Sequence, residues 1–377
     1  MPSLVAPVKY QLKYIDFSSN EVIINDWFKL DFTRSEGSIG YLYLDLPDIY
    51  PYRFFKKDAV IEVYRSIGGY GYYLEGETGY LIRAIRYKTD ENGNKLLHLL
   101  CHDGISILDR RIVPYPSETD QSRINMGADD ALKQLVTDNI ISPTDTERSI
   151  PTKYFYRDTK YSQCPVIIQK EFAYRKLLPL MQEICDDSKA GGSYLTFDVV
   201  RGSSNFFLFK TYVNTRGRDR GITSGSPLVF SLEAGNLSYV TVANDYSEER
   251  NFIYAGGRGQ DSNRVIATAS DPISIAESPF SRWEDWIDAT DVENPDAVQS
   301  EADTRLHQAS QKVVINAHLQ QTVDCMYGLH YGFGDIVNIN YHGFVIDVHI
   351  DTVSITCDSN SVENVKVYGR NLEDTEY

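Results

Sequence analysis

The sequence predicts a β-dominated α+β protein built from two β-barrel domains with an α+β module inserted between them. Short segments of alternating apolar and polar residues, separated by turn residues, fill the first and last thirds of the chain. The 27 tyrosines, against 16 phenylalanines and 3 tryptophans, also favour sheet, because tyrosine suits half-buried strand faces and interfaces. Since 377 residues exceed the usual size of one domain, we expect domains at residues 1–115, 116–227 and 228–377.

The first predicted domain, residues 1–115, has the pattern of short strands and turns that is typical of a barrel or sandwich. Two turn signals interrupt it, at residues 68–71 and 91–94, and the second contains the dipeptide Asn92-Gly93, which is typical of a tight hairpin. Strands are expected at residues 9–16, 41–46, 59–64, 81–87 and 95–101.

The middle segment, residues 116–227, combines helices with strands. Residues 126–140 carry apolar side chains at helical spacing, with Asp129 and Asp130 in the first turn, where the helix dipole favours carboxylates. A second helix is expected at residues 171–185, with a kink or a later start caused by Pro179. A strand pair is expected to follow at residues 194–200 and 205–209.

The last segment, residues 228–377, returns to strand patterns around one expected helix at residues 302–317. An acidic stretch precedes this helix. The expected strands are residues 228–232, 237–243, 251–255, 319–325, 336–341, 344–355 and 364–368.

The charge balance argues against nucleic-acid binding. The net charge is −16 and the isoelectric point about 4.9, whereas phosphate contacts need a basic surface. The excess negative charge either keeps the chain soluble or forms a surface for a specific neighbour or a lumen that repels DNA. The five cysteines make no CxxC pair and are expected as reduced core thiols. We expect no signal peptide and no stable membrane anchor.

A search for catalytic motifs predicts no catalytic, cofactor or metal site. His98 and His102 are four residues apart, but their surroundings are typical of a strand rather than of a helix that could present both to a metal. Residues 256–259, Gly-Gly-Arg-Gly, lack the residues that complete a phosphate-binding loop and predict a turn. The acidic pairs are typical of solvated surfaces. We therefore expect a protein that is not an enzyme.

Five segments, in order, resemble the baseplate hub family of bacteriophage tails, which includes siphophage hubs, the N-terminal part of tail-associated lysins and a similar myophage hub. Each motif is short, so their order and spacing carry the resemblance. The segments are residues 101–113 (with Arg110-Arg111), 230–237, 251–257, 282–289 and 327–337. In the last segment, Leu329-His330-Tyr331 stands where the family usually has an acidic residue.

The resemblance implies a homotrimer at the distal end of the tail tube. Each subunit would supply two tube-like β-barrels, so that three subunits form a pseudo-hexameric ring that adapts the sixfold tube to a threefold tip and forms a conduit for DNA. The implied partners are a distal tail or tail tube protein, a tape measure protein, and tip or fibre proteins. The implied location is the virion tail tip, after synthesis in the host cytoplasm.

The family motifs also supply candidate structural or interface residues. We expect the charged residues of residues 282–288 to be buried structural or interface charges rather than catalysts. The candidates are Arg110, Arg111, Arg282, Trp283, Glu284, Asp288, Gly334 and Asp335.

Two alternatives remain open from the sequence. A cell-wall glycan hydrolase would need two carboxylates held across a sugar cleft, which sequence does not locate. A receptor-binding or carbohydrate-binding tail protein would use Trp283 and Trp286 as exposed stacking platforms, whereas the hub hypothesis predicts these tryptophans to be largely buried.

Overall fold

The computed structural model describes residues 7–18, 20–89, 93, 95–115, 119, 122–202, 207–310, 312–341, 343–359 and 363–371. Strands make up 45% of the chain and helices 18%, which confirms the predicted β-dominated α+β class. Within the described part of the chain, no helix has both the length and the apolar character needed to cross a membrane.

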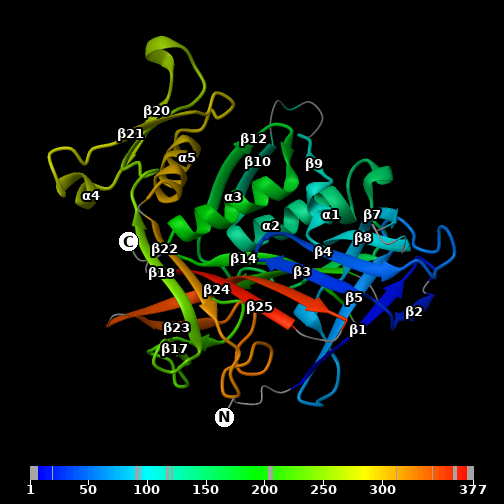
Figure 1. The fold of residues 1–377 in the computed structure, drawn as a ribbon. Coiled ribbons are helices and arrows are strands. Elements are labelled where there is room, and N and C mark those ends of the chain that lie inside the picture. The colour runs from blue at the N-terminus through cyan, green and yellow to red at the C-terminus, as the bar shows by residue number, and fades with distance from the viewer. Residues whose placement is uncertain are drawn as a thin grey trace.

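One hydrogen-bonded sheet of 13 strands joins the two ends of the chain (Figure 1). The first and last thirds meet where β3 (Lys29–Ser35) pairs antiparallel with β24 (Phe344–Asp358). Among the described strands, the path of pairing runs from β16 to β2 and does not close, so no closed barrel is present. The other strands are β1 (Val8–Ile15), β2 (Glu21–Ile24), β4 (Ser38–Pro47), β5 (Val60–Ile67), β6 (Tyr73–Leu74), β7 (Tyr80–Thr89), β8 (Lys95–Asp103), β16 (Asp219–Arg220), β17 (Val229–Ser231), β23 (Ile336–Tyr341) and β25 (Glu363–Asn371).

The alternation in the sequence creates this sheet's two faces. Leu42 and Leu44 of β4 are fully buried, while Tyr41 and Tyr43, which alternate with them, are exposed. The buried face belongs to a core to which strands of both chain ends contribute. The hairpin of β7 and β8 is confirmed, although residues 91, 92 and 94 of its predicted Asn-Gly turn lie outside the described residues.

The middle of the chain packs helices over a second core (Figure 1). The predicted first helix is confirmed as α2 (Ala128–Val136), which continues into a π-helical turn, Thr137–Ile141. The second helix, α3 (Leu177–Ala190), takes the later start, so that Pro179 stands in the first turn, where its missing N–H costs nothing. The remaining elements are α1 (Ser106–Asp109), β9 (Ile112–Val113), β10 (Ser122–Gly127), a 3-10 turn (Thr146–Arg148), β11 (Phe155–Arg157), β12 (Ile167–Phe172), β13 (Arg175–Lys176), β14 (Leu195–Arg201) and β15 (Phe207–Val213).

The prediction of helix from residue 171 was wrong for its first six residues. Glu171 and Phe172 belong to β12, and Arg175 and Lys176 form β13. The expected pair after α3 is confirmed as the antiparallel strands β14 and β15, while residues 205–206 of the second predicted strand lie outside the described residues.

A small α+β unit stands between the two strands of a long ribbon, β18 (Leu237–Asp245) and β22 (Lys312–Leu319). Figure 1 shows the unit protruding from the body at the upper left. It has its own apolar core, in which α5 (Pro295–Gln308) covers one face of a three-stranded sheet. The unit's other elements are β19 (Phe252–Gly256), a 3-10 turn (Asp261–Asn263), β20 (Ile266–Ser270), α4 (Pro272–Ala276) and β21 (Glu284–Asp288).

The predicted position of the last helix, residues 302–317, was wrong by about two turns. The helix begins at Pro295, because Asn294 accepts a hydrogen bond from the backbone N–H of Asp296 and Pro295 suits the first helical position. Residues 312–317 belong to β22 instead. The Gly-Gly-Arg-Gly segment begins the connection from β19 to β20 and forms the predicted turn only in part: Gly256 ends β19, and the backbone N–H of Gly257 donates to the carbonyl of Val265.

Candidate functional site

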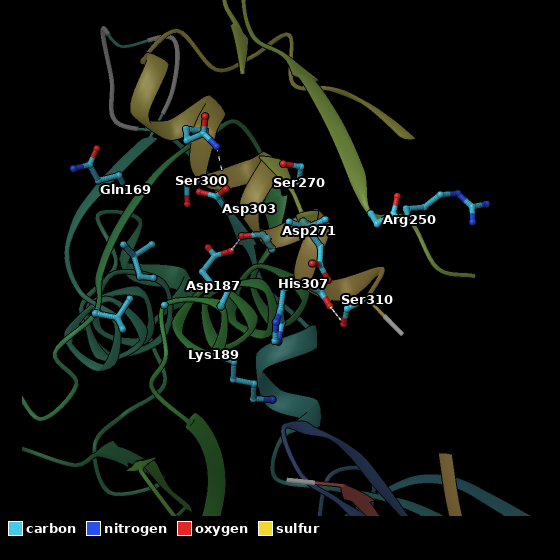
Figure 2. Close-up of a pocket in the computed structure, with 18 of the residues that line it drawn as sticks. Gln169, Asp187, Lys189, Arg250, Ser270, Asp271, Ser300, Asp303, His307 and Ser310 are labelled. Carbon is cyan, nitrogen blue, oxygen red and sulfur yellow. Dashed lines mark hydrogen bonds between the residues drawn. The ribbon is translucent and has the colours of Figure 1, made fainter. Parts of the chain in front are cut away.

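A groove of about 780 Å³ lies between the middle module and the inserted unit (Figure 2). One wall consists of residues 166–169, in and before β12, together with the C-terminal end of α3. The opposite wall consists of α5 and the segment that leads into α4. Figure 2 shows Asp303 and His307 on the α5 side and Asp187 and Lys189 on the α3 side. The groove therefore separates two packed units of one subunit.

Several carboxylates line this groove, and they differ in whether groups of the protein already pair with them. Asp271 caps α4 by accepting the N–H groups of Ile273 and Ser274. In contrast, Asp296 and Asp303 of α5 are exposed, and no basic side chain pairs with them among the described residues. Asp296 and Asp303 are therefore available to a ligand, whereas Glu301 of the same helix is not, because it pairs with Lys170.

A buried charge cluster fixes the two walls of the groove to each other. The ammonium group of Lys170, in β12, lies 3.1 Å from Asp187 of α3 and 2.9 Å from Glu301 of α5. Burial lowers the pKa of Lys170, but the carboxylates of Asp187 and Glu301 raise it more, so the lysine stays charged. Thr304 of α5 also donates to Asp187. The cluster holds the inserted unit against the middle module.

Other chemistry-bearing side chains are built into the fold rather than gathered at a site. Among the described residues, no group of three or more His, Cys, Asp or Glu side chains could hold a metal ion. His98 and His102 lie on strand β8, as expected, and His98 pairs with Asp45 at 2.5 Å. All five cysteines are free and buried, which confirms the predicted core thiols. Burial raises the pKa of the Cys101 thiol, so that thiol is a poor nucleophile.

The predicted pair Arg110 and Arg111 lies at the end of α1. Arg110 forms an ion pair with Asp58 at 3.1 Å, and Arg111 donates to the carbonyl of Arg148 at 3.0 Å. Burial lowers the pKa of both guanidinium groups. Their partners lie in the first β-rich region and the middle module, so the two arginines connect these parts.

The predicted residues around β21 are exposed, and the expectation of burial within the subunit was wrong. Trp283 and Trp286 are 51% and 48% exposed. Arg282 pairs with Glu284 at 2.7 Å and lies 3.8 Å from the ring centre of Phe252, while Asp288 pairs with Arg264. These side chains are exposed because α5 covers only one face of the three-stranded sheet that contains β21. An interface role for these residues stays a prediction.

Gly334 and Asp335 form the turn before β23. Asp335 is 3% exposed and accepts the backbone N–H groups of Arg218 at 2.7 Å and Gly332 at 2.8 Å. Gly334 has a φ of +83°, which favours glycine. The eight predicted residues thus lie in three separate places and do not form one site.

Sequence reasoning missed the buried arginines that join distant strands. Arg34 of β3 and Arg216, which follows β15, both bind Oδ2 of Asp198 in β14, and both lie over the ring of Phe333. Asp198 lies in β14, Leu195–Arg201, whose residues 195–200 are all buried. In the sequence, Thr196 and Asp198 alternate with apolar residues as on a strand with one solvated face, so the sequence contains no signal for this buried pair.

The sequence matches, over residues 17–368, the family described as Siphovirus ReqiPepy6 Gp37-like protein. The chain belongs to this family. No curated protein matches its sequence.

Solved structures of tail proteins have the same fold. The tail protein from Neisseria meningitidis MC58 is 13% identical, with a TM-score of 0.59 and 96% of each chain covered. The 43 kDa tail protein of prophage MuSo2 from Shewanella oneidensis is 13% identical, with a TM-score of 0.56, and the match covers 97% of this chain and 99% of that one. These matches confirm the predicted resemblance to phage tail proteins.

A structure from Francisella shares the fold over part of its length. The match to the Francisella PdpA-VgrG complex has a TM-score of 0.53 and 12% identity, and it covers 98% of this chain but 53% of that one. This member of the Siphovirus Gp37-like family therefore has a fold found both in prophage tail proteins and in the Francisella PdpA-VgrG complex.

Proposed function

We propose that this protein is a structural component of a phage tail tip: a homotrimeric baseplate hub that adapts a sixfold tail tube to a threefold tip and forms a conduit for DNA. The observation that carries the proposal is the whole-length match to prophage tail proteins, in which 96% of both chains are covered in the Neisseria case. A match of this extent supports the view that the two proteins share the architecture of the whole chain rather than that of one domain.

The arrangement of the strands is consistent with a ring subunit. Strands from both β-rich ends, residues 1–115 and 228–377, share one sheet and one core, so a subunit presents these strands as one body. Three subunits with two tube-like regions each supply the six positions that a sixfold tube requires. Exposed tyrosines such as Tyr41 and Tyr43 suit contacts between subunits, and a net charge of −16 disfavours retention of passing DNA.

The proposal places the protein at the virion tail tip. Its neighbours there would be a distal tail or tail tube protein, a tape measure protein, and tip or fibre proteins. Residues 116–227 would form the α+β module between the two tube-like regions.

Measurement of oligomeric state tests the proposal directly. We expect a trimer by sedimentation equilibrium, and a threefold ring with an open centre in electron micrographs of the protein mixed with tail tube or distal tail protein. A protein that stays monomeric at high concentration and adds no ring to tail tubes contradicts the hub function.

Carbohydrate or receptor binding is a second candidate, because Trp283 and Trp286 are half exposed on the inserted unit. Exposed indole rings can stack on sugar rings. Binding of host-surface glycans that is lost in Trp283→Ala and Trp286→Ala variants supports this function, and equal binding by wild type and variants excludes these tryptophans as its platform.

A further inference from the structure

One wall of the groove in Figure 2 contains an open strand edge. Among the described strands, β12 pairs only with β10. The N–H of Ala128 donates to the carbonyl of Val166 at 2.9 Å, and Met126 stands opposite Ile168. Because backbone groups alternate in direction along an antiparallel strand, those of Val166 and Ile168 face β10, whereas those of Ile167 and Gln169 face the other way.

This edge is open at one end and covered at the other. At the covered end, Glu171 accepts the N–H group of Glu293, and Lys170 pairs with Glu301. At the open end, the consecutive residues 166–169 line the groove. Four residues of strand span roughly 13 Å, which accommodates a short extended segment. An unpaired edge beside a groove is the geometry that binds peptides by strand addition.

The side chains around the edge indicate what kind of segment fits. Asp296 and Asp303 on the facing helix are exposed carboxylates without basic partners among the described residues. They are two helical turns apart, or roughly 10 Å along the axis. Ile167 and Ile273, which are 59% and 66% exposed, add apolar surface to the same groove. Lys189 and Arg250 also line the groove, but the five carboxylates of Asp187, Glu249, Asp271, Asp296 and Asp303 outnumber them. The complementary segment is therefore basic, with aliphatic side chains between its charges.

We propose that this groove binds an extended, basic and aliphatic segment of a partner protein, which adds as a strand to the open edge of β12 and places its lysine or arginine side chains on Asp296 and Asp303. The excess of carboxylates in the groove favours a different, basic protein as the occupant over a second copy, which carries the same net charge of −16. The groove is complete within one subunit, so this inference does not depend on the proposed trimer.

The test uses the full-length protein and a short peptide of alternating lysine and valine. Two further peptides carry N-methyl groups, one on the amides of the lysines and the other on those of the valines. Strand addition uses only one of these two sets of amides, so one methylated peptide should bind about tenfold more weakly or worse while the other binds like the parent. Hydrogen exchange should slow at residues 167 and 169 on binding. Equal affinity of the two methylated peptides, or protection elsewhere only, overturns the proposal.

Matched variants test the two recognition elements separately. The double variant Asp296→Asn/Asp303→Asn should weaken peptide binding by about three- to tenfold. Asp291 is an exposed carboxylate of the same unit outside the groove, so the control variant Asp291→Asn should leave peptide binding unchanged. If Asp291→Asn weakens binding as much as the double variant does, the peptide is held by general charge attraction, which contradicts the proposed site.

Gln169→Pro removes an outward-facing N–H that the pairing with β10 does not use, so the fold should persist while peptide binding is lost. Unchanged binding by a folded Gln169→Pro protein contradicts strand addition. If this variant does not fold, the N-methylated peptides and the exchange of residues 167 and 169 in the wild type decide the question.

Discussion

The guanidinium group of Arg65 binds both carboxylate oxygens of Glu363, at 2.6 and 3.1 Å, although the two residues are 298 positions apart in the chain. The Arg65 side chain is fully buried, and it also donates to the carbonyl of Tyr327 at 2.8 Å. The pair therefore fixes β5 near the start of the chain to β25 near its end.

Removal of one partner from this pair should destabilise the protein strongly. Arg65→Met leaves Glu363 without its guanidinium in a buried place, and we expect the free energy of unfolding to fall by about 3–5 kcal/mol in urea titrations. The double variant Arg65→Met/Glu363→Gln should be less destabilised than the sum of the single variants. Arg282→Met, which removes an exposed pair, serves as control. Additive single effects contradict a direct coupling between Arg65 and Glu363.

Asp103 should make the stability depend on pH. Burial, and then the nearby Asp198, raise the pKa of Asp103 to about 8, whereas an unfolded chain ionises an aspartate near pH 4. The folded state therefore holds an extra proton between these values, so the free energy of unfolding should fall as the pH rises from about 6.5 to 8. Asp103→Asn should flatten that fall in urea titrations at several pH values.

Histidines act in the opposite direction up to about pH 7.5, but the wild type and Asp103→Asn contain the same histidines, so the difference between their slopes isolates Asp103. Burial lowers the pKa of His102 and His307, so their contribution to stability grows as the pH rises through their titration range and is complete above it. An identical slope for wild type and Asp103→Asn between pH 6.5 and 8 contradicts the assigned titration.

Tryptophan fluorescence can test the prediction that the residues around β21 lie in an interface. Trp27 is 9% exposed, whereas Trp283 and Trp286 are half exposed. In an isolated subunit of a Trp27→Phe variant, acrylamide should quench the remaining emission efficiently. If residues around β21 form a contact in the assembled tail tip, assembly should protect this emission. Unchanged quenching in the assembled state places these two tryptophans outside the interfaces.

Gly334→Ala should destabilise the protein more than Gly192→Ala. Both glycines have a φ near +80°, so both alanines carry the strain of a left-handed conformation, about 1 kcal/mol. At Gly334 the new Cβ would also lie 3.0 Å from Cβ of Arg216, while Gly192 has no atom within 4 Å of that position. Equal thermal shifts of the two variants contradict this crowding.

The strands were predictable because one buried face imposes an alternation that is visible in the sequence. β23 has the bounds that were predicted, and β7 and β8 pair as expected. The pairing of β3 with β24 was not predictable, because alternation determines which face a residue occupies and not which distant strand lies beside it.

The inserted unit and the buried charges could not be identified for different reasons. The acidic residues of α5 hide its apolar stripe, which is made of small side chains such as Ala297 and Ala302. Lys170 stands between the polar residues Gln169 and Glu171, and Arg65 between Tyr64 and Ser66, which is typical of solvated positions. Only the strands and helices packed over them show that they are buried. The open edge of β12 is likewise a property of pairing, which a single strand's sequence does not contain.

The ribbon of β18 and β22 has a consequence for how this protein can change over time. Asp245 and Lys312 are backbone partners at the point where the inserted unit leaves the ribbon, so roughly 5 Å separates the entry and exit of that unit. A short turn could join them without moving any strand of the large sheet. The tip of this hairpin is thus a position at which related phages can exchange, lose or enlarge a whole folded unit by recombination while the rest of the subunit keeps its shape.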